Sequence, residues 1–325
     1  MMADLPEVTV IVVTYNHANY VLETLDSIAA QTLQPTKLIL VDDASSDDTV
    51  QIVESWNEQH GGKATVLAHV TNTGLCRGLN EALNLVRTSL YAYISGDDRM
   101  APQRLELQVK RWVDDGGRAA GVYSNARRID EAGQELQPDY RTEHFWPEVL
   151  EGKVHAELLR RDWMPAASLL LSTEAVRKVG AYDERWFFED YDLLLRLARE
   201  HRFLVVDEPL VDFRTLPTSL GSTRFNDGDT GFLAARVGIW SAQYGVTPEG
   251  DAWLRRSLPP LAIRLWRTGD HPEVAQAGLL ATAEGPALNL RLRAAMISAG
   301  IHRQPRGLTA LSALAGWARR HLRRR

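Results

Sequence analysis

The chain has 325 residues, of which 45% are hydrophobic and 24% are charged, values typical of a globular protein. Its formal net charge of -5 argues against a nucleic acid as partner of the whole chain, because such partners need a basic surface. The length predicts one domain of about 200 to 250 residues with an appendage.

The chain has one cysteine, Cys76, and this excludes an intrachain disulfide and a zinc site with several thiolates. We expect a buried structural thiol in a reducing compartment. The N-terminus lacks the pattern of a signal peptide, and no apolar run approaches the roughly 18 residues of a membrane span. These features predict a cytoplasmic protein.

The first hundred or so residues alternate between strand and helix patterns. Residues 8–14 are apolar and rich in β-branched side chains, which predicts a central parallel strand. The spacing of Val21, Leu25 and Ile28 predicts a helix, and residues 37–41 form the next strand. Further helices are expected at 48–56 and 79–85, and further strands at 65–69 and 90–94. The alternation predicts an α/β fold with a doubly wound, mostly parallel sheet flanked by helices.

The second half is less regular. We expect a loop-rich insertion over 138–163 and an irregular loop bracketed by Pro209 and Pro217. Beyond Gly231 only helical patterns remain. Between these features we expect a helix opened by Pro102, strands at 119–123, 168–171 and 203–206, and a helix over 189–200. The predicted domains are therefore residues 1–230 and an all-helical C-terminal extension, residues 231–325.

Polar residues follow three of the predicted strands. Thr14, Tyr15 and Asn16 end the first strand, Asp43 follows the second, and Asp97 and Asp98 follow the fourth. In a doubly wound sheet the carboxyl ends of the strands meet at one edge, where ligands bind. Adjacent carboxylates repel unless a cation or hydrogen bonds compensate them, and oxygen ligands beside a diphosphate suit Mg²⁺ or Mn²⁺.

At this point the sequence resembles glycosyltransferase family 2 throughout roughly its first 215 residues. The matching stretches follow the order of the family: VTVIVVTYNHANYVLETLDSIAAQT, LILVDDASSDDT, NTGLCRGLNEAL, YISGDD, LLLSTEAVRKVGAYDE and FFEDYDLLLRLA. The resemblance implies a GT-A fold and an inverting glycosyltransferase that depends on a nucleotide sugar. We expect a UDP-sugar as donor, a sugar or lipid-linked saccharide as acceptor, and a role in cell-surface polysaccharide or glycoconjugate synthesis.

The resemblance also implies roles for the polar residues. Tyr15 and Asp43 would hold the base of the nucleotide, Asp97 would contact the ribose, and Asp98 would bind the metal on the diphosphate. Thr14 and Asn16 belong to the same nucleotide-binding group. Two local alternatives stay open, since an aromatic residue such as Tyr15 also occurs in turns and Asp43 also suits the start of a helix.

The pair Glu189–Asp190 opens a predicted helix and carries the catalytic prediction. Asp190 lies over the apolar stripe of that helix, and a half-buried carboxylate with a raised pKa accepts the proton of an attacking hydroxyl. The resemblance implies the same role. The alternative is an ordinary acidic first turn favoured by the helix dipole. Trp186, Phe187, Phe188 and Glu189 are expected to contact the acceptor, and packing of the aromatic residues on the sheet is an equal alternative.

Two positions depart from the family pattern. Leu216 stands where the family often carries a histidine after an aromatic-Arg pair, here Phe213 and Arg214, and Ser95 stands at the first carboxylate of the family's DxD motif. Two other functions compete with the main prediction. A sugar-phosphate nucleotidyltransferase would need a glycine-rich phosphate loop, and residues 14–20 contain no glycine. The other is a non-catalytic nucleotide-sugar-binding module.

The C-terminal tail is strongly basic. Leucine and alanine repeat at helical spacing over residues 308–322, and the charged residues from 301 onward are Arg303, Arg306, Arg319, Arg320, Arg323, Arg324 and Arg325. Such a helix suits an anionic membrane surface and would place the protein on the inner face of the plasma membrane. A helix docked on the rest of the chain is the alternative.

Overall fold

The computed structural model describes residues 5–226, 228–283, 288–298 and 300. The chain divides into two compact units between Ser219 and Leu220, whereas the sequence patterns change near residue 230. The predicted amphipathic helix at 308–322 lies outside the described residues.

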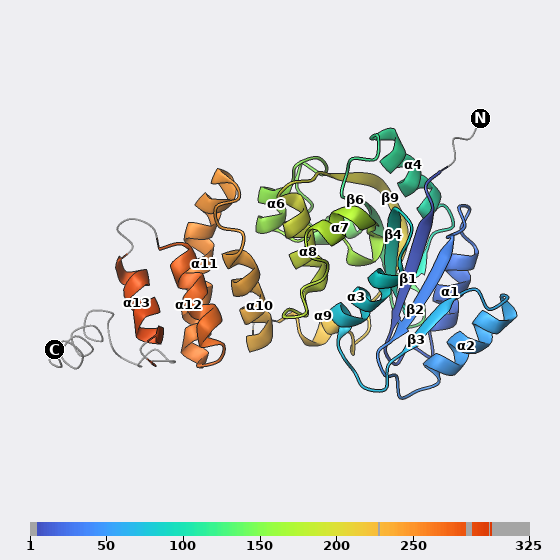
Figure 1. Ribbon diagram of the computed structural model, residues 1–325, viewed down its shortest axis with the longest axis horizontal. Coiled ribbons are helices and arrows are strands. Elements are labelled where there is room, and N and C mark those ends of the chain that lie inside the picture. Colours follow the sequence, from blue (N-terminus) through green and yellow to red (C-terminus); the bar gives the residue numbers. More distant parts are fainter. Residues whose placement is uncertain (1–4, 227, 284–287, 299, 301–325) are drawn as a thin grey trace. The chain divides into compact units, whose positions relative to one another are not determined.

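The first unit is built on one sheet with strand order β3-β2-β1-β4-β8-β6-β9-β5, and β7 pairs with β6 (Figure 1). The strands are β1 (Val8–Thr14), β2 (Lys37–Asp42), β3 (Thr65–Ala68), β4 (Leu90–Ser95), β5 (Arg99–Met100), β6 (Gly121–Ile129), β7 (Glu135–Gln137), β8 (Leu170–Ser172) and β9 (Phe203–Arg214). Strands β3, β2, β1 and β4 are parallel, as are β6 and β9. Short antiparallel β8 joins these two groups, so the predicted α/β fold is confirmed.

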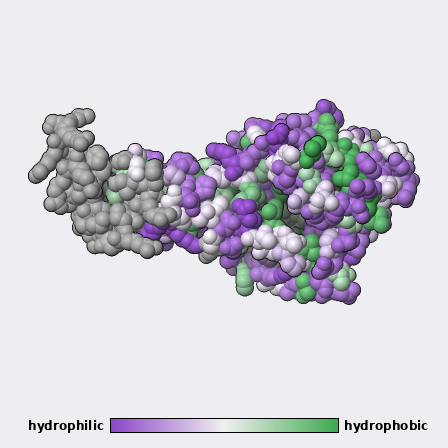
Figure 2. Space-filling model, turned by 90° about the horizontal axis from the view of Figure 1, so that it is seen from below, coloured by the Kyte–Doolittle hydropathy of each residue, from purple (hydrophilic) through white to green (hydrophobic). Residues whose placement is uncertain are grey.

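Helices cover both faces of this sheet. Side chains of α1 (Val21–Ala29), α2 (Thr49–Gln59) and α4 (Arg104–Asp114) pack with Val8, Val10 and Val12 in one hydrophobic core. Side chains two apart on a strand share a face, so this alternation places the core on one side of β1. Helix α3 (Leu75–Leu85) lies on the opposite side from α1 and α2 in Figure 1. On the face drawn in Figure 2, hydrophobic residues lie in scattered groups among hydrophilic ones.

Strand β9 corrects the prediction of an irregular loop that begins at Pro209. The strand continues to Arg214, and the register against β6 shifts on both sides of Asn125, the partner of Pro209. Proline has no N–H for a strand ladder and is tolerated at such a bulge. The strand therefore extends beyond Pro209 and carries Arg214 to the end of β4.

The predicted insertion contains short helices, α5 (Tyr140–His144) and α6 (His155–Arg160). Its interior is anchored at Tyr123 of β6, whose hydroxyl donates to the carbonyl oxygen of Leu150 at 2.6 Å and accepts from Nε1 of Trp163 at 3.0 Å. A turn of 3-10 helix (Ala166–Ser168) leads into β8, and α7 (Thr173–Lys178) and α8 (Glu189–Ala198) follow.

Only helices occur in the described part of the second unit (Figure 1). They are α9 (Leu220–Thr223), α10 (Thr230–Ser241), α11 (Pro248–Thr268), α12 (Pro272–Ala281) and α13 (Leu288–Ser298). The start of α11 is capped by the Thr247 hydroxyl, which accepts from the Gly250 N–H at 3.1 Å, and left-handed Gly269 ends it. None of the helices in the described ranges has both the length and the apolar character needed to cross a membrane.

Candidate functional site

The strand register brings the predicted polar clusters together. Thr14 of β1 pairs with Asp42 of β2, and Val13 pairs with Ser95 of β4. The three strands therefore end at one level. The Asp43 N–H donates to the Thr14 carbonyl at 2.9 Å and the Gly96 N–H donates to the Val13 carbonyl at 2.8 Å, so the loops begin side by side.

The loop after β1 has a fixed backbone. The Thr14 hydroxyl donates to Oδ1 of Asp42 at 2.7 Å. Asn16 adopts a left-handed φ of 57°, and its Oδ1 accepts from the Ser46 N–H at 2.8 Å. These two side chains are engaged within the protein, whereas the side chain of Tyr15 is 50% exposed. Of the three predicted nucleotide-binding residues in this loop, Tyr15 offers an exposed ring surface to a ligand.

Asp43 organises the loop that follows β3. Its Oδ1 accepts from the Thr73 N–H at 2.7 Å, and its Oδ2 accepts from the Gly74 N–H at 2.8 Å. The ring of His69 lies between two carboxylates, with Nδ1 2.9 Å from Oδ1 of Asp43 and Nε2 2.9 Å from Oε2 of Glu81. Burial opposes ionisation of both partners, but these hydrogen bonds outweigh it, raising the pKa of His69 and lowering the pKa of Asp43. Asp43 is thus ionised and holds the loop in place through these hydrogen bonds.

The Asp97–Asp98 turn is closed by Arg214. The Arg214 N–H donates to Oδ1 of Asp98 at 2.8 Å, and its Nε donates to the Asp97 carbonyl at 2.8 Å. Its Nη2 contacts Oε2 of Glu23 at 2.8 Å, and its guanidinium lies over the ring of Tyr20. The side chain is buried, and each of its three nitrogens donates within the protein. Sequence analysis assigned no role to Arg214, and the length of β9 explains why it reaches this turn.

Leu216, where the sequence analysis noted a leucine in place of a histidine, has a buried apolar side chain. Asp98 is also buried, with 2% exposure. Burial raises the pKa of Asp98 well above its usual range, and the charge of Asp97 adds to this effect. Arg104 is buried nearby, where it donates to Oε1 of Gln108 and to the Leu169 carbonyl, and burial lowers its pKa to about 9.

The carboxylates of the Asp97–Asp98 turn are candidate ligands for a divalent cation. The described residues contain no group of three or more His, Cys, Asp or Glu side chains able to hold a metal ion. Mg²⁺ and related cations are commonly bound by one or two protein carboxylates, with water and substrate phosphates completing the shell. A buried aspartate beside a second carboxylate fits that arrangement, because a cation would relieve their repulsion.

The predicted base lies at the start of α8 in a group of three carboxylates. Asp190 is partly exposed, and its Oδ1 accepts from the Tyr191 N–H at 2.7 Å. Burial raises the pKa of Asp190 to about 6 although this hydrogen bond opposes the shift. Burial and the charge of Asp190 raise the pKa of Glu189 to about 8, and Glu189 accepts from the Tyr93 hydroxyl at 3.3 Å. Burial and both neighbours also raise the pKa of Asp162, which sequence analysis missed.

The aromatic residues before α8 differ in exposure. Phe188 is buried and stacks on Tyr191 with ring centroids 4.9 Å apart, so its ring packs inside the unit. Trp186 and Phe187 are partly exposed. The Cys76 thiol is buried, as predicted, and donates to the Trp186 carbonyl at 3.0 Å, which ties this segment to α3.

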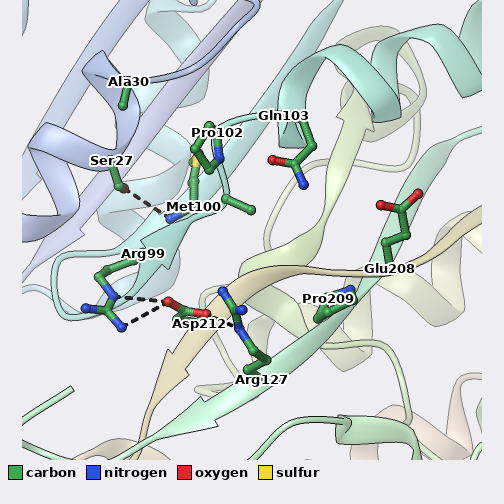
Figure 3. Close-up of a pocket in the computed structure, with 11 residues that line it drawn as sticks. Ser27, Ala30, Arg99, Met100, Pro102, Gln103, Arg127, Glu208, Pro209 and Asp212 are labelled. Carbon is green, nitrogen blue, oxygen red and sulfur yellow. Dashed lines mark hydrogen bonds and ion pairs between the residues drawn. The ribbon is translucent and has the colours of Figure 1, made fainter. Parts of the chain in front are cut away.

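A cavity of about 530 Å³ lies apart from these residues, between the end of α1, β5 and β9 (Figure 3). Arg99 and Arg127 hold Asp212 between them, with Nε to carboxylate distances of 3.1 and 2.7 Å. Gln103 and Glu208 also line the space. None of the predicted site residues lines this cavity, so the candidate site is the strand edge.

Comparison with known proteins identifies the class. Residues 9–184 match the model of glycosyl transferase family 2, and the chain belongs to this family. An uncharacterized glycosyltransferase of Rickettsia typhi is 27% identical over 240 residues, covering 73% of this chain and 71% of the relative. The protein is therefore a glycosyltransferase, and the nucleotidyltransferase and non-catalytic alternatives are set aside.

Solved structures show the same fold at lower identity. The mannosyltransferase of Pyrobaculum calidifontis in complex with GDP-Man and Mn²⁺ has a TM-score of 0.60 and 21% identity, covering 98% of this chain and 87% of that chain. TarS of S. aureus, residues 1–349 in complex with UDP-GlcNAc, has a TM-score of 0.56 and 17% identity, covering 90% and 92%. These neighbours confirm the GT-A fold.

Proposed function

We propose that the protein transfers a sugar from a nucleoside-diphosphate sugar to an acceptor hydroxyl. The favoured donor is a UDP-sugar. The proposed reaction depends on a metal ion and inverts the configuration of the anomeric carbon. The observation that carries the proposal is the Asp97–Asp98 turn, which Arg214 holds at the level where β1 and β2 also end. The structural neighbours bound to UDP-GlcNAc and GDP-Man support a nucleotide sugar as donor.

In this proposal Thr14, Tyr15, Asn16, Asp43 and Asp97 form the nucleotide subsite. The exposed ring of Tyr15 stacks on the base. Oδ1 of Asp43 already accepts several hydrogen bonds, while Oδ2 accepts from the Gly74 N–H. A carboxylate has about four acceptor positions, so Oδ2 keeps capacity for an N–H of the base.

Asp98 would hold Mn²⁺ or Mg²⁺ in this proposal, and such a cation would supply positive charge for the leaving diphosphate. The neighbour solved with Mn²⁺ supports this assignment. The chain's own contribution is positional, since Arg214 fixes the Asp98 carboxylate through its backbone N–H.

Asp190 accepts the proton of the acceptor hydroxyl as that oxygen attacks the anomeric carbon. Its pKa of about 6 leaves it ionised at neutral pH and yet more basic than an ordinary aspartate. One base opposite one leaving group needs no covalent intermediate, so the configuration inverts. Trp186, Phe187, Phe188 and Glu189 bound the acceptor subsite, with Trp186 and Phe187 offering the exposed ring surface.

The acceptor we propose is a sugar or a lipid-linked saccharide used for cell-surface polysaccharide or glycoconjugate synthesis. The support is the basic sequence of residues 301–325, in which each arginine near an anionic membrane contributes about 1 kcal/mol of attraction. The protein would then act in the cytoplasm, on the inner face of the plasma membrane.

A panel of nucleotide sugars tests the donor. We expect one UDP-sugar to raise the melting temperature and to be hydrolysed slowly in the presence of Mn²⁺ or Mg²⁺, with neither effect in excess EDTA. If only a GDP-sugar stabilised the protein, the donor would be a GDP-sugar and not a UDP-sugar. Equal turnover in EDTA would refute the metal dependence.

A further inference from the structure

His17 stands out among the described residues around the strand edge because neither nitrogen of its ring has a hydrogen-bond partner. Nδ1 is buried and unpartnered within the described chain. Nε2 lies 4.0 Å from Oδ1 of Asp97, too far for a hydrogen bond. A buried polar atom without a partner costs about 1 to 3 kcal/mol, so its persistence next to a binding site calls for a functional reason.

The backbone of His17 is fixed by hydrogen bonds. The His17 N–H donates to the Thr49 hydroxyl at 2.8 Å, and the His17 carbonyl accepts from the N–H groups of Tyr20 and Val21 at 2.9 Å each. The side chain is only 16% exposed. The backbone that carries the ring is therefore held in place before any ligand arrives.

Gly96 allows the ring to lie directly on the turn that carries Asp97 and Asp98. A Cβ atom at Gly96 would come within 2.6 Å of Cγ2 of Thr14 and 3.0 Å of Nδ1 of His17. Glycine thus leaves the space that the ring and Thr14 occupy. This packing accounts for the burial of Nδ1, and it directs Nε2 toward Asp97.

The tautomer follows from the same contacts. Nδ1 has no acceptor in reach, so a proton there would be buried without a partner. In the neutral ring the proton is therefore more favourable on Nε2, which faces the Asp97 carboxylate. In this tautomer Nε2 is a hydrogen-bond donor.

We propose that His17 is a donor-binding residue, whose Nε2–H hydrogen-bonds an oxygen of the diphosphate in the nucleotide sugar beside Asp97. This inference rests on the proposed function. It assigns to His17 a polar contact with the diphosphate at a turn where the three side-chain nitrogens of Arg214 already donate within the protein.

Binding of UDP and of uridine to the full chain separates this role from a structural one. His17→Ala should lower the affinity for UDP by about 10- to 100-fold, the range for a hydrogen bond to a charged group, and leave uridine binding unchanged. His17→Gln, which keeps an N–H near the position of Nε2, should recover part of the loss. His60→Ala is the matched control, because His60 is exposed on another part of the unit and stacks on Trp56.

Imidazole ¹⁵N spectra give a readout independent of turnover. We expect the signal of His17 to show a protonated Nε2 and to shift on addition of UDP but not of uridine. Equal losses of UDP and uridine affinity in His17→Ala, or a protonated Nδ1, would overturn the inference while leaving the proposed function intact. Failure of the unaltered protein to bind any nucleoside diphosphate would instead remove the proposed function and this inference with it.

Discussion

At the scale of single residues, Asp98 offers the sharpest test of the metal site. Asp98→Asn keeps an oxygen that accepts from the Arg214 N–H, so the fold should survive with a melting temperature near that of the unaltered protein. The substitution removes the negative charge that would bind the cation. We expect transfer to fall below detection and the affinity for Mn²⁺ in the presence of UDP to drop. Calorimetric titration measures the second effect, and near-normal metal-dependent turnover would rule out this ligand.

Asp190 gives a second test at the same scale. Asp190→Asn should bind donor normally but lose about 10²- to 10⁴-fold in acceptor-dependent rate, the usual contribution of a general base. Glu200→Gln, beyond the end of the same helix, removes an exposed ion pair with Lys178 and should leave the rate unchanged. If donor affinity fell in Asp190→Asn while the rate of the bound complex did not, the base would lie elsewhere.

The pH profile of the unaltered enzyme should report the same group. A base must be ionised to accept a proton, and burial raises the pKa of Asp190 to about 6. The rate at saturating substrate should therefore fall as the pH drops through about 6, and Asp190→Asn should lose this limb of the profile.

The residues predicted from sequence were those that lie directly after strands, because a strand pattern and the residues that follow it are local features. Arg214 and Asp162 were missed for the opposite reason. Arg214 acts on a turn more than a hundred residues away, through a strand whose length was hidden by Pro209. The carboxyl of Asp162 interacts with Asp190 and Glu189 only in the folded chain, and the local sequence around it has no periodicity.

At the scale of elements, the loop between β3 and α3 depends on one carboxylate. Asp43→Asn removes the charge that pairs with His69 and weakens the hydrogen bonds from Thr73 and Gly74. We expect a lower melting temperature and weaker UDP binding, with the rate of the bound complex largely intact. Unchanged affinity for UDP would refute the role of Asp43 in nucleotide binding.

The loss of stability caused by Asp43→Asn should become smaller at both low and high pH. The lowered pKa of Asp43 means that its contribution to stability is lost as the pH falls through that value. The raised pKa of His69 means that the contribution of the imidazolium is lost as the pH rises through the raised value. The difference in melting temperature between Asp43→Asn and the unaltered protein should be greatest between these two pH values, and a constant difference would contradict the ion pair.

The element order of the first hundred residues was predictable, because apolar runs and helical spacing there agree with the tertiary structure. Strand β9 was not, since proline normally ends a strand and only the bulge against β6 makes it acceptable. The antiparallel strand β8 has the composition of a parallel strand because it is buried within the sheet, so its direction could not be inferred from its residues.

At the scale of the whole molecule, the basic tail predicts attachment to membranes. The full chain should co-sediment with vesicles that contain anionic lipids, high salt should release it, and a chain that ends at Pro305 should remain in solution. Vesicles of neutral lipid are the control. If full-length and truncated proteins partition alike at low salt, the tail is a packing element or a surface for a partner, and the proposal of a membrane-bound acceptor loses its support.

The pairing of β6 with β8 also has a consequence for how this enzyme could change its acceptor. After β6 the chain turns back as β7, which pairs with β6, then leaves the sheet for α5 and α6 and returns through β8 beside β6. The predicted donor residues lie at the ends of β1, β2 and β4 or directly after them, outside this excursion. The insertion thus lies between two adjacent strands and brings Asp162 to the predicted base, so exchange with the insertion of a relative should alter the acceptor-dependent rate while the donor preference stays unchanged.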